Sequence, residues 1–133
     1  MNQNTPKSVL VTVCTSCRHA GTERDDAPGK HLLTMVEKAS LGQTNIVVRG
    51  TQCLSVCNRV CSISLSGEGS YTFVFGDLDS AKDAEAIVAM AVACARAAYG
   101  FIPWKERPEA LRKGTIARIA PPGWSPDDGS APA

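Results

Sequence analysis

The chain has 133 residues, a net charge of +1 and few aromatic residues. A chain of this length fits one domain and buries enough apolar surface to fold without disulfides. The small charge gives no support for a nucleic-acid partner, no apolar run approaches the roughly 18 residues that cross a bilayer, and the first residues lack a signal-peptide pattern. We therefore expect a cytoplasmic protein, in which closely spaced cysteines more often bind metal than form disulfides.

The first half of the chain predicts a β-α-β unit. Residues 8–13 are apolar and β-branched, which is typical of a buried strand. Residues 17–29 are polar and end in Pro-Gly, which predicts a long loop. Apolar residues recur with helical spacing over residues 30–41, and residues 45–49 form a second apolar run. A strand, a helix and a strand in this order make a right-handed β-α-β unit, so we expect two parallel, adjacent strands.

The second half predicts a β-hairpin followed by a long helix. Residues 61–75 read as two strands joined by a glycine-rich turn. Residues 77–99 carry an apolar stripe of helical period, with Asp79 or Ser80 as N-cap and Gly100 just past the end. The resulting order, β-α-β-β-β-α, predicts a single α/β domain with a thioredoxin-like fold.

This fold accounts for residues 8–100, which we expect to bind a metal or cluster. Residues 101–120 form a C-terminal arm, in which Pro108 can open a short helix. The arm is rich in basic residues around Trp104, so it is either a docking patch for a partner protein or an arm packed over the sheet. Residues 121–133 are rich in Pro, Gly and Ser, and we expect them to be disordered.

Five of the six cysteines follow the two predicted parallel strands. Cys14 and Cys17 follow the first strand, while Cys53, Cys57 and Cys61 follow the second at every fourth residue. The two groups therefore lie at corresponding ends of neighbouring strands and can converge on one metal centre. The first two cysteines with Cys53 and Cys57 supply the four thiolates that an iron–sulfur cluster takes. Zinc accepts the same four, so spacing alone does not separate the two.

The groups around these sulfurs can adjust their chemistry. Loop amides and the hydroxyl groups of Thr15, Ser16 and Ser55 are placed to donate hydrogen bonds to the sulfurs, which would tune a reduction potential. Arg18 and Arg59 flank the cysteines and can orient an acidic partner or offset the negative charge of a cluster.

The segment Gln52-Cys53-Leu54-Ser55-Val56-Cys57 resembles the Cys-Leu-Gly-x-Cys motif of thioredoxin-like [2Fe-2S] ferredoxins, the group that includes the small ferredoxin subunit of bacterial respiratory NADH dehydrogenase. The resemblance implies that Cys14, Cys17, Cys53 and Cys57 bind one [2Fe-2S] cluster. It implies an electron-transfer protein that serves a partner enzyme and is not itself an enzyme, and it favours a homodimer.

This chain departs from the ferredoxins in two places. Cys14 and Cys17 are closer together than the first pair usually is, and Cys61 falls where the ferredoxins tend to carry the cis-proline of the fold. Cys61 is therefore either a ligand that replaces Cys14 or Cys17, or a spare thiol.

A second resemblance covers roughly residues 8 to 120. The chain is similar to an uncharacterised bacterial family of predicted metal-binding proteins, whose members often sit beside genes for cobalamin synthesis and cobalt handling. The matching segments are Cys14-x-x-Cys17-Arg18, Cys53-Leu54-Ser55-x-Cys57-x-Arg59-x-Cys61, Tyr71-x-Phe73-x-Phe75-Gly76-Asp77-Leu78-Asp79 and Pro103-Trp104-Lys105-Glu106-Arg107-Pro108-Glu109. This resemblance implies a place in cobalamin or cobalt metabolism.

Other functions for the same cysteines stay open. A metal-handling protein would bind zinc or cobalt through the same four thiolates. The Cys14-x-x-Cys17 spacing is also that of a dithiol oxidoreductase, but such a pair opens a helix and here a polar loop follows. The remaining alternative is buried or disulfide-bonded cysteine without metal.

The other chemistry-bearing residues give weaker signals. Cys94 lies on the apolar side of the long helix, where a cysteine is expected in the core. His19 is two residues from Cys17 and His31 opens a helix, and both are expected at the surface rather than on a metal. With two histidines, no visible pairing and no P-loop or dinucleotide motif, no catalytic set is predicted.

Overall fold

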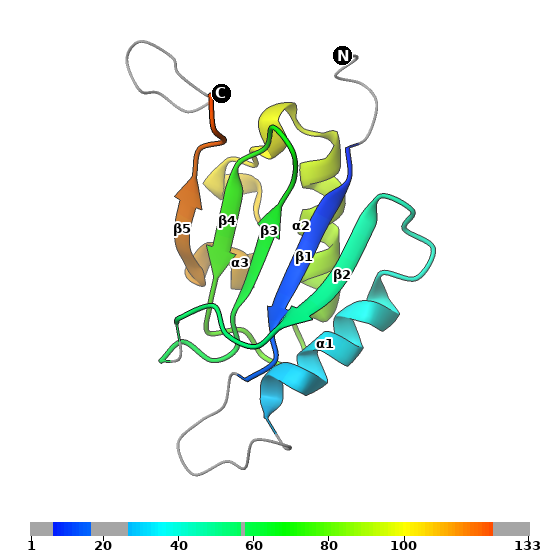
Figure 1. Ribbon diagram of the computed structural model, residues 1–133, viewed down its shortest axis with the longest axis vertical. Coiled ribbons are helices and arrows are strands. Elements are labelled where there is room, and N and C mark those ends of the chain that lie inside the picture. The colour runs from blue at the N-terminus through cyan, green and yellow to red at the C-terminus, as the bar shows by residue number, and fades with distance from the viewer. Residues whose placement is uncertain (1–6, 17–26, 57, 124–133) are drawn as a thin grey trace.

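The structure, a computed structural model, describes residues 7–16, 27–56 and 58–123. These residues form a five-stranded sheet with helices packed against it (Figure 1). The strands are β1 (Val9–Cys14), β2 (Ile46–Thr51), β3 (Ile63–Ser66), β4 (Thr72–Phe75) and β5 (Thr115–Ile119). The helices are α1 (Pro28–Ala39), α2 (Ala84–Arg96) and α3 (Glu109–Lys113), with 3-10 turns η2 (Ala98–Gly100) and η3 (Trp104–Glu106).

The strand order in the sheet is β2-β1-β3-β4-β5. β1 and β2 are parallel neighbours joined through α1, as the sequence predicts for a β-α-β unit. β3 pairs antiparallel with β1 and with β4, which confirms the predicted hairpin. The observed order is therefore the predicted β-α-β-β-β-α, extended by one strand at the far edge of the sheet.

The core lies between the sheet and the helices. Alternate residues of each central strand point into it, as in Val11 and Val13 of β1 and Phe73 and Phe75 of β4. α1 and α2 contact each other and both pack on β1 and β2. Cys94 of α2 is 4% exposed and belongs to this core, as predicted.

Helix α2 is shorter at both ends than the predicted helix over residues 77–99. At its start, the Asp79 side chain accepts hydrogen bonds from the amides of Ala81 and Lys82, at 2.7 and 3.0 Å. The Asp83 side chain accepts one from the Asp79 amide at 2.7 Å, so a separate turn precedes the helix. At its end, Ala97 is extended, with φ −87° and ψ 149°, so the helix stops at Arg96 and a separate 3-10 turn follows.

The C-terminal segment is packed on the sheet. β5 pairs antiparallel with β4, and the pattern of residues 115–119 did not predict it. Arg107 is the buried link: its Nε donates to the Ile102 carbonyl oxygen at 3.0 Å and its Nη1 to Oγ1 of Thr115 at 3.1 Å. Its guanidinium also lies 4.7 Å from the centre of the Phe73 ring. Residues 124–133 of the predicted tail lie outside the described residues.

Candidate metal centre

β1 and β2 bring the two cysteine-bearing loops to the same end of the sheet. Cys14 is the last residue of β1 and stands opposite Thr51, the last residue of β2 (Figure 1). The amide of Thr15 donates to the Thr51 carbonyl oxygen at 2.8 Å, so the pairing continues one residue beyond the strands. Cys53 follows two residues after Thr51, so the first loop begins beside the second.

Two hydroxyl groups fasten the loops together. Oγ1 of Thr15 donates to the Thr51 carbonyl oxygen at 3.0 Å, and Oγ of Ser16 donates to that of Gln52. We call Thr15 and Ser16 the hydroxyl clasp. The prediction that these hydroxyl groups bond the sulfurs is thus wrong for Thr15, whose bond goes to a carbonyl. Ser16 Oγ lies 3.7 Å from the Cys14 sulfur as well, within reach of a weak hydrogen bond.

The Cys14 side chain faces the second loop. It is 1% exposed, and its sulfur lies 3.8 Å from the carbonyl oxygen of Gln52, the residue before Cys53. The start of α1 closes the other side: a Cβ at Gly29 would overlap the carbonyl oxygen of Cys14. Only a glycine permits this close approach, so the start of α1 is held against Cys14.

The loop after Cys53 curls so that its backbone points at the sulfur. Ser55 has a φ of 64°, in the left-handed region, and its amide donates to the Cys53 sulfur at 3.1 Å. Ser55 stands where the ferredoxin motif carries glycine, the residue that adopts this conformation most readily. Cys53 is exposed and Cys14 is buried, so the two thiols reach from the interior to the surface.

Cys61 belongs to the inner side of the second loop. It is 1% exposed and packs in the core. It is held by a two-way backbone pairing with Leu78, N to O at 3.0 and 3.1 Å, and the Val60–Cys61 peptide bond is cis. Cys61 also lines a hollow of about 250 Å³ with Pro28 and residues 77–80.

Part of the predicted ligand set lies outside the described residues, namely Cys17 and Cys57, together with Arg18 and His19. Within the described residues, no three His, Cys, Asp or Glu side chains come together as a metal site. Cys61 therefore does not complete a three-ligand group with Cys14 and Cys53. His31 is exposed on α1, as predicted.

An ion pair holds the end of the second loop. Arg59 Nε lies 2.5 Å from Oδ2 of Asp77, and the Asp77 amide donates to the Arg59 carbonyl oxygen at 3.1 Å. Gly76 packs against this loop, since a Cβ there would lie 2.7 Å from the Cβ of Arg59. The amide of Gly76 also donates to the Gly114 carbonyl oxygen at 2.8 Å. The loop is thereby joined to the end of α3, a contact that local sequence patterns do not reveal.

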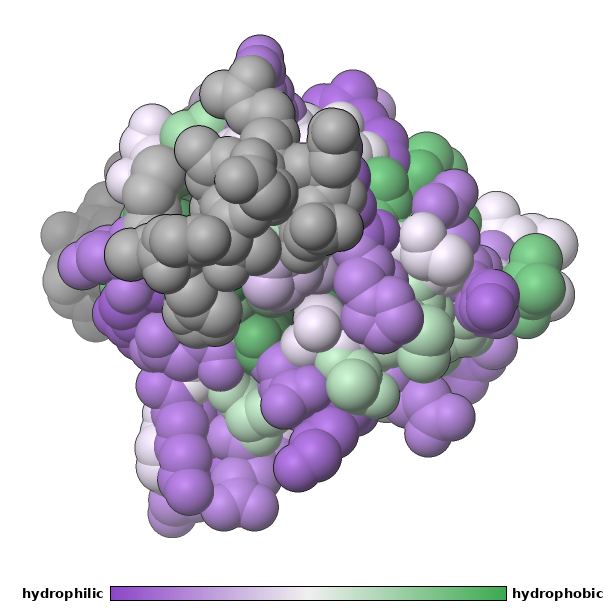
Figure 2. All heavy atoms as spheres, turned by 90° about the horizontal axis from the view of Figure 1, so that it is seen from below, coloured by the Kyte–Doolittle hydropathy of each residue, from purple (hydrophilic) through white to green (hydrophobic). Residues whose placement is uncertain are grey.

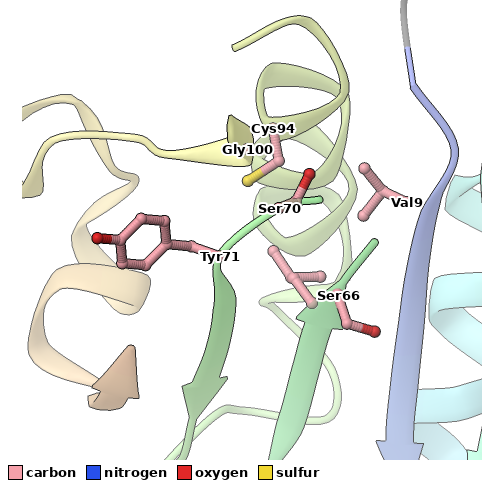
Figure 3. A pocket seen from close by; sticks show the side chains of 7 residues that line it. Val9, Ser66, Ser70, Tyr71, Cys94 and Gly100 are labelled. Carbon is pink, nitrogen blue, oxygen red and sulfur yellow. The ribbon is translucent and has the colours of Figure 1, made fainter. Parts of the chain in front are cut away.

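Figure 2 shows this end of the molecule, where hydrophilic side chains dominate and smaller apolar areas lie between them. The remaining cysteine, Cys94, lies toward the other end of β1, in a small pocket that it shares with Val9 and Ser70 (Figure 3). That pocket has a volume of about 10 Å³, too small for a ligand larger than a water molecule. Burial raises the pKa of the Cys94 thiol to about 12, partly offset by the nearby Arg107. At neutral pH, Cys94 is therefore a neutral thiol.

Comparisons with known proteins agree with the fold. A solved thioredoxin-like [2Fe-2S] ferredoxin from Aquifex aeolicus matches with a TM-score of 0.57 and 16% identity, over 90% of this chain and 99% of that one. At this identity the match confirms the thioredoxin-like fold. The comparison with curated proteins gives no match. None of the helices in the described residues has the length and hydrophobicity of a membrane span. The model of one family, described as Protein of unknown function (DUF1636), matches residues 11–122, and this chain belongs to that family.

Proposed function

We propose that this protein transfers electrons through a [2Fe-2S] cluster held by Cys14, Cys17, Cys53 and Cys57. The observation that carries the proposal is the contact between the two cysteine loops. The Cys14 sulfur lies 3.8 Å from the backbone of the residue before Cys53, at the shared end of two parallel strands. Cysteines from segments far apart in sequence are thereby brought to one end of the sheet, which supports a shared cluster.

The described residues fit such a group by their chemistry. Cys14 and Cys53 offer thiolates, and the amide of Ser55 points at the Cys53 sulfur. A backbone amide aimed at a sulfur is the kind of outer donor that orients and tunes a metal-bound cysteine. The cluster, when bound, supplies one electron that is reversibly gained and lost. The solved protein of similar fold is a [2Fe-2S] ferredoxin, which supports this group over a bare dithiol.

The chain's own residues set the access to this site. Cys14 is shielded beneath α1 and the hydroxyl clasp, whereas Cys53 is exposed. Electrons would therefore enter and leave on the Cys53 side, toward a partner protein. An enzyme of cobalamin or cobalt metabolism as that partner, and a homodimer as the functional state, stay predictions.

Metal analysis of protein purified without oxygen tests the proposal. We expect about two irons and two sulfides per chain, with visible bands that dithionite bleaches. Cys53→Ser and Cys57→Ser should each abolish these bands, whereas Cys94→Ala, which changes a core thiol, should leave the spectrum intact.

Two other results would replace the proposal. One zinc or cobalt per chain without sulfide would identify a metal-handling protein that uses the same thiolates. Turnover of disulfide substrates by metal-free protein would identify a dithiol oxidoreductase.

A further inference from the structure

The C-terminal segment presents a surface that combines an exposed indole with positive charge. It consists of Trp104, Lys105, Arg112 and Lys113, and we call it the Trp104 surface. We propose that this surface docks an acidic face of a partner protein. That the partner exchanges electrons rests on the proposed function, whereas the docking itself does not.

The geometry of Trp104 is that of an interface residue rather than a core residue. Its side chain is 55% exposed, among the most exposed large apolar side chains described. The Arg112 guanidinium lies 5.5 Å from the centre of its ring. Stacked Arg and Trp side chains attract one another, which fixes the guanidinium in place before a partner arrives. Trp and Arg are also the residues that most often dominate the energy of protein interfaces.

In the part of the chain that the structure describes, Arg112 is not paired within the fold in the way that Arg107 is. Its Nε is buried and has no hydrogen-bond partner among the described residues. Arg107 in the same segment provides a contrast, because its Nε and Nη1 both donate within the fold. Arg107 is therefore a structural arginine, and Arg112 is a guanidinium that the fold positions without pairing it to a carboxylate.

The charge around the surface is positive. Among the side chains of residues 104–113 that are not buried, Lys105, Arg112 and Lys113 are basic, and Glu106 and Glu109 are acidic. Glu109 is engaged by Lys113, whose Nζ lies 3.0 Å from Oε1; this hydrogen bond, with Lys113 and Arg112 as neighbouring charges, lowers the pKa of Glu109. No ion pair within the described residues neutralises Lys105 or Arg112. The complementary surface is therefore one that presents carboxylates.

The surface lies next to the second cysteine loop. Arg112 and Lys113 are in the last turn of α3, and the next residue, Gly114, accepts a hydrogen bond from Gly76 at 2.8 Å. Gly76 in turn packs on Arg59, which lies between Cys57 and Cys61 in the chain. Figure 1 shows α3 at the same end of the sheet as the ends of β1 and β2. The α3 side of the Trp104 surface is thus joined, through Gly114 and Gly76, to the end of the loop that begins at Cys53.

An acidic protein fits this surface better than a nucleic acid does. Single-stranded nucleic acid is held by a row of aromatic side chains along a positive groove. Here one indole stands on the surface, and Glu106 and Glu109 interrupt the basic residues. The chain as a whole has a charge of only +1, too small for strong attraction to phosphates.

Calorimetric titration of the full-length protein with a synthetic Glu/Asp-rich peptide carrying one leucine tests the proposal. At low salt, Trp104→Ala and Lys105→Glu should each raise the dissociation constant at least about tenfold, as loss of an interface anchor does. Lys38→Glu is the matched control: it makes the same charge reversal on exposed α1, at the other edge of the sheet, and should change binding less than about twofold.

Three results would overturn the proposal. They are the absence of peptide binding at millimolar peptide, an equal loss in the Lys38→Glu control, and tighter Trp104-dependent binding of single-stranded oligothymidylate than of the peptide. Far-ultraviolet circular dichroism checks that each variant is folded. If Trp104→Ala does not fold, Lys105→Glu still tests the proposal. The titration measures no metal, so a negative metal analysis and a negative titration refute separate claims.

Discussion

Ser55 sits in a backbone conformation that its own side chain disfavours. Its φ of 64° brings its amide within 3.1 Å of the Cys53 sulfur, so the strained residue is also the one that serves the sulfur. A Cβ in this region costs energy that a glycine avoids. The motif likeness places a glycine at this position, but the sequence of this chain alone does not show that Ser55 adopts the glycine conformation.

Replacing Ser55 by glycine should therefore stabilise the protein. We expect Ser55→Gly to raise the free energy of unfolding by about 0.5–1 kcal/mol, because the strain exceeds the extra entropy of an unfolded glycine. Ser55→Ala keeps the Cβ and removes only the hydroxyl, so it should have little effect. Denaturant titration measures both variants. Equal stability of the glycine and alanine variants would contradict the role assigned to the backbone.

The buried thiol of Cys94 makes stability depend on pH in the alkaline range. Burial raises the pKa of this thiol from 9.0 to about 12 in the folded protein. The unfolded chain therefore loses the proton first as the pH rises above 9, and the folded state loses stability. The slope contributed by one such group is about 1.4 kcal/mol per pH unit.

Comparison of the wild type with Cys94→Ala isolates this effect, because the other titrating groups are common to both. Between pH 9 and about 12, the wild type should lose stability more steeply than the variant, and below pH 9 the two curves should run parallel. Thermal unfolding across this range is the measurement. Parallel curves above pH 9 would mean that the folded state does not hold Cys94 as a neutral thiol.

At the scale of elements, the hydroxyl clasp joins what two parallel strands bring together. Thr15 and Ser16 bond the backbone of the second loop, at Thr51 and Gln52. Both bonds cross between segments that are far apart in the sequence. The clasp thus fixes the spacing of the two cysteine loops, which would reduce the entropy lost if they bind the proposed cluster.

Thr15→Val should loosen the clasp at nearly constant volume. Loss of a partly buried hydrogen bond should lower the free energy of unfolding by about 1 kcal/mol and speed the loss of metal to a chelator. Thr34→Val makes the same change on exposed α1, where the hydroxyl bonds the Lys30 carbonyl oxygen at 3.3 Å, and should have a smaller effect. Unfolding midpoints and rates of metal release decide the matter. Equal effects of the two variants would show that the Thr15 bond does not position the loops.

The elements show which parts of the structure a sequence can predict. The strands and helices with clear periodicity, such as β1 and α1, lie within two residues of their predicted bounds, and the parallel β-α-β unit brings Cys14 beside the Cys53 loop as expected. β5 was missed because its five residues are half-exposed at a sheet edge and show no alternation. The clasp depends on contacts between distant segments, so no local pattern indicates it.

For the whole molecule, the C-terminal segment connects the end of the sheet that carries the cysteine loops to the core. β5 completes the sheet, Gly114 bonds Gly76 beside the second cysteine loop, and Arg107 anchors the segment over Phe73. Burial lowers the pKa of Arg107, with the nearby positive charge of Arg118 acting in the same direction. The anchor is therefore a cation whose desolvation is offset by its hydrogen bonds and by the aromatic ring.

Arg107→Lys tests whether this anchor holds the segment. The lysine keeps the charge but cannot reproduce the planar pair of donors to Ile102 and Thr115, so we expect a loss of about 2–3 kcal/mol in the free energy of unfolding. Hydrogen exchange of the β5 amides should quicken as well, because the strand loses its attachment to the core. Arg118→Lys, at an exposed arginine that lies 5.2 Å from the Phe101 ring, is the control and should change little. If the β5 amides stay as protected in Arg107→Lys as in the wild type, the pairing with β4 alone holds the segment. The link between the core and the end of the sheet that carries the cysteine loops would then not depend on Arg107.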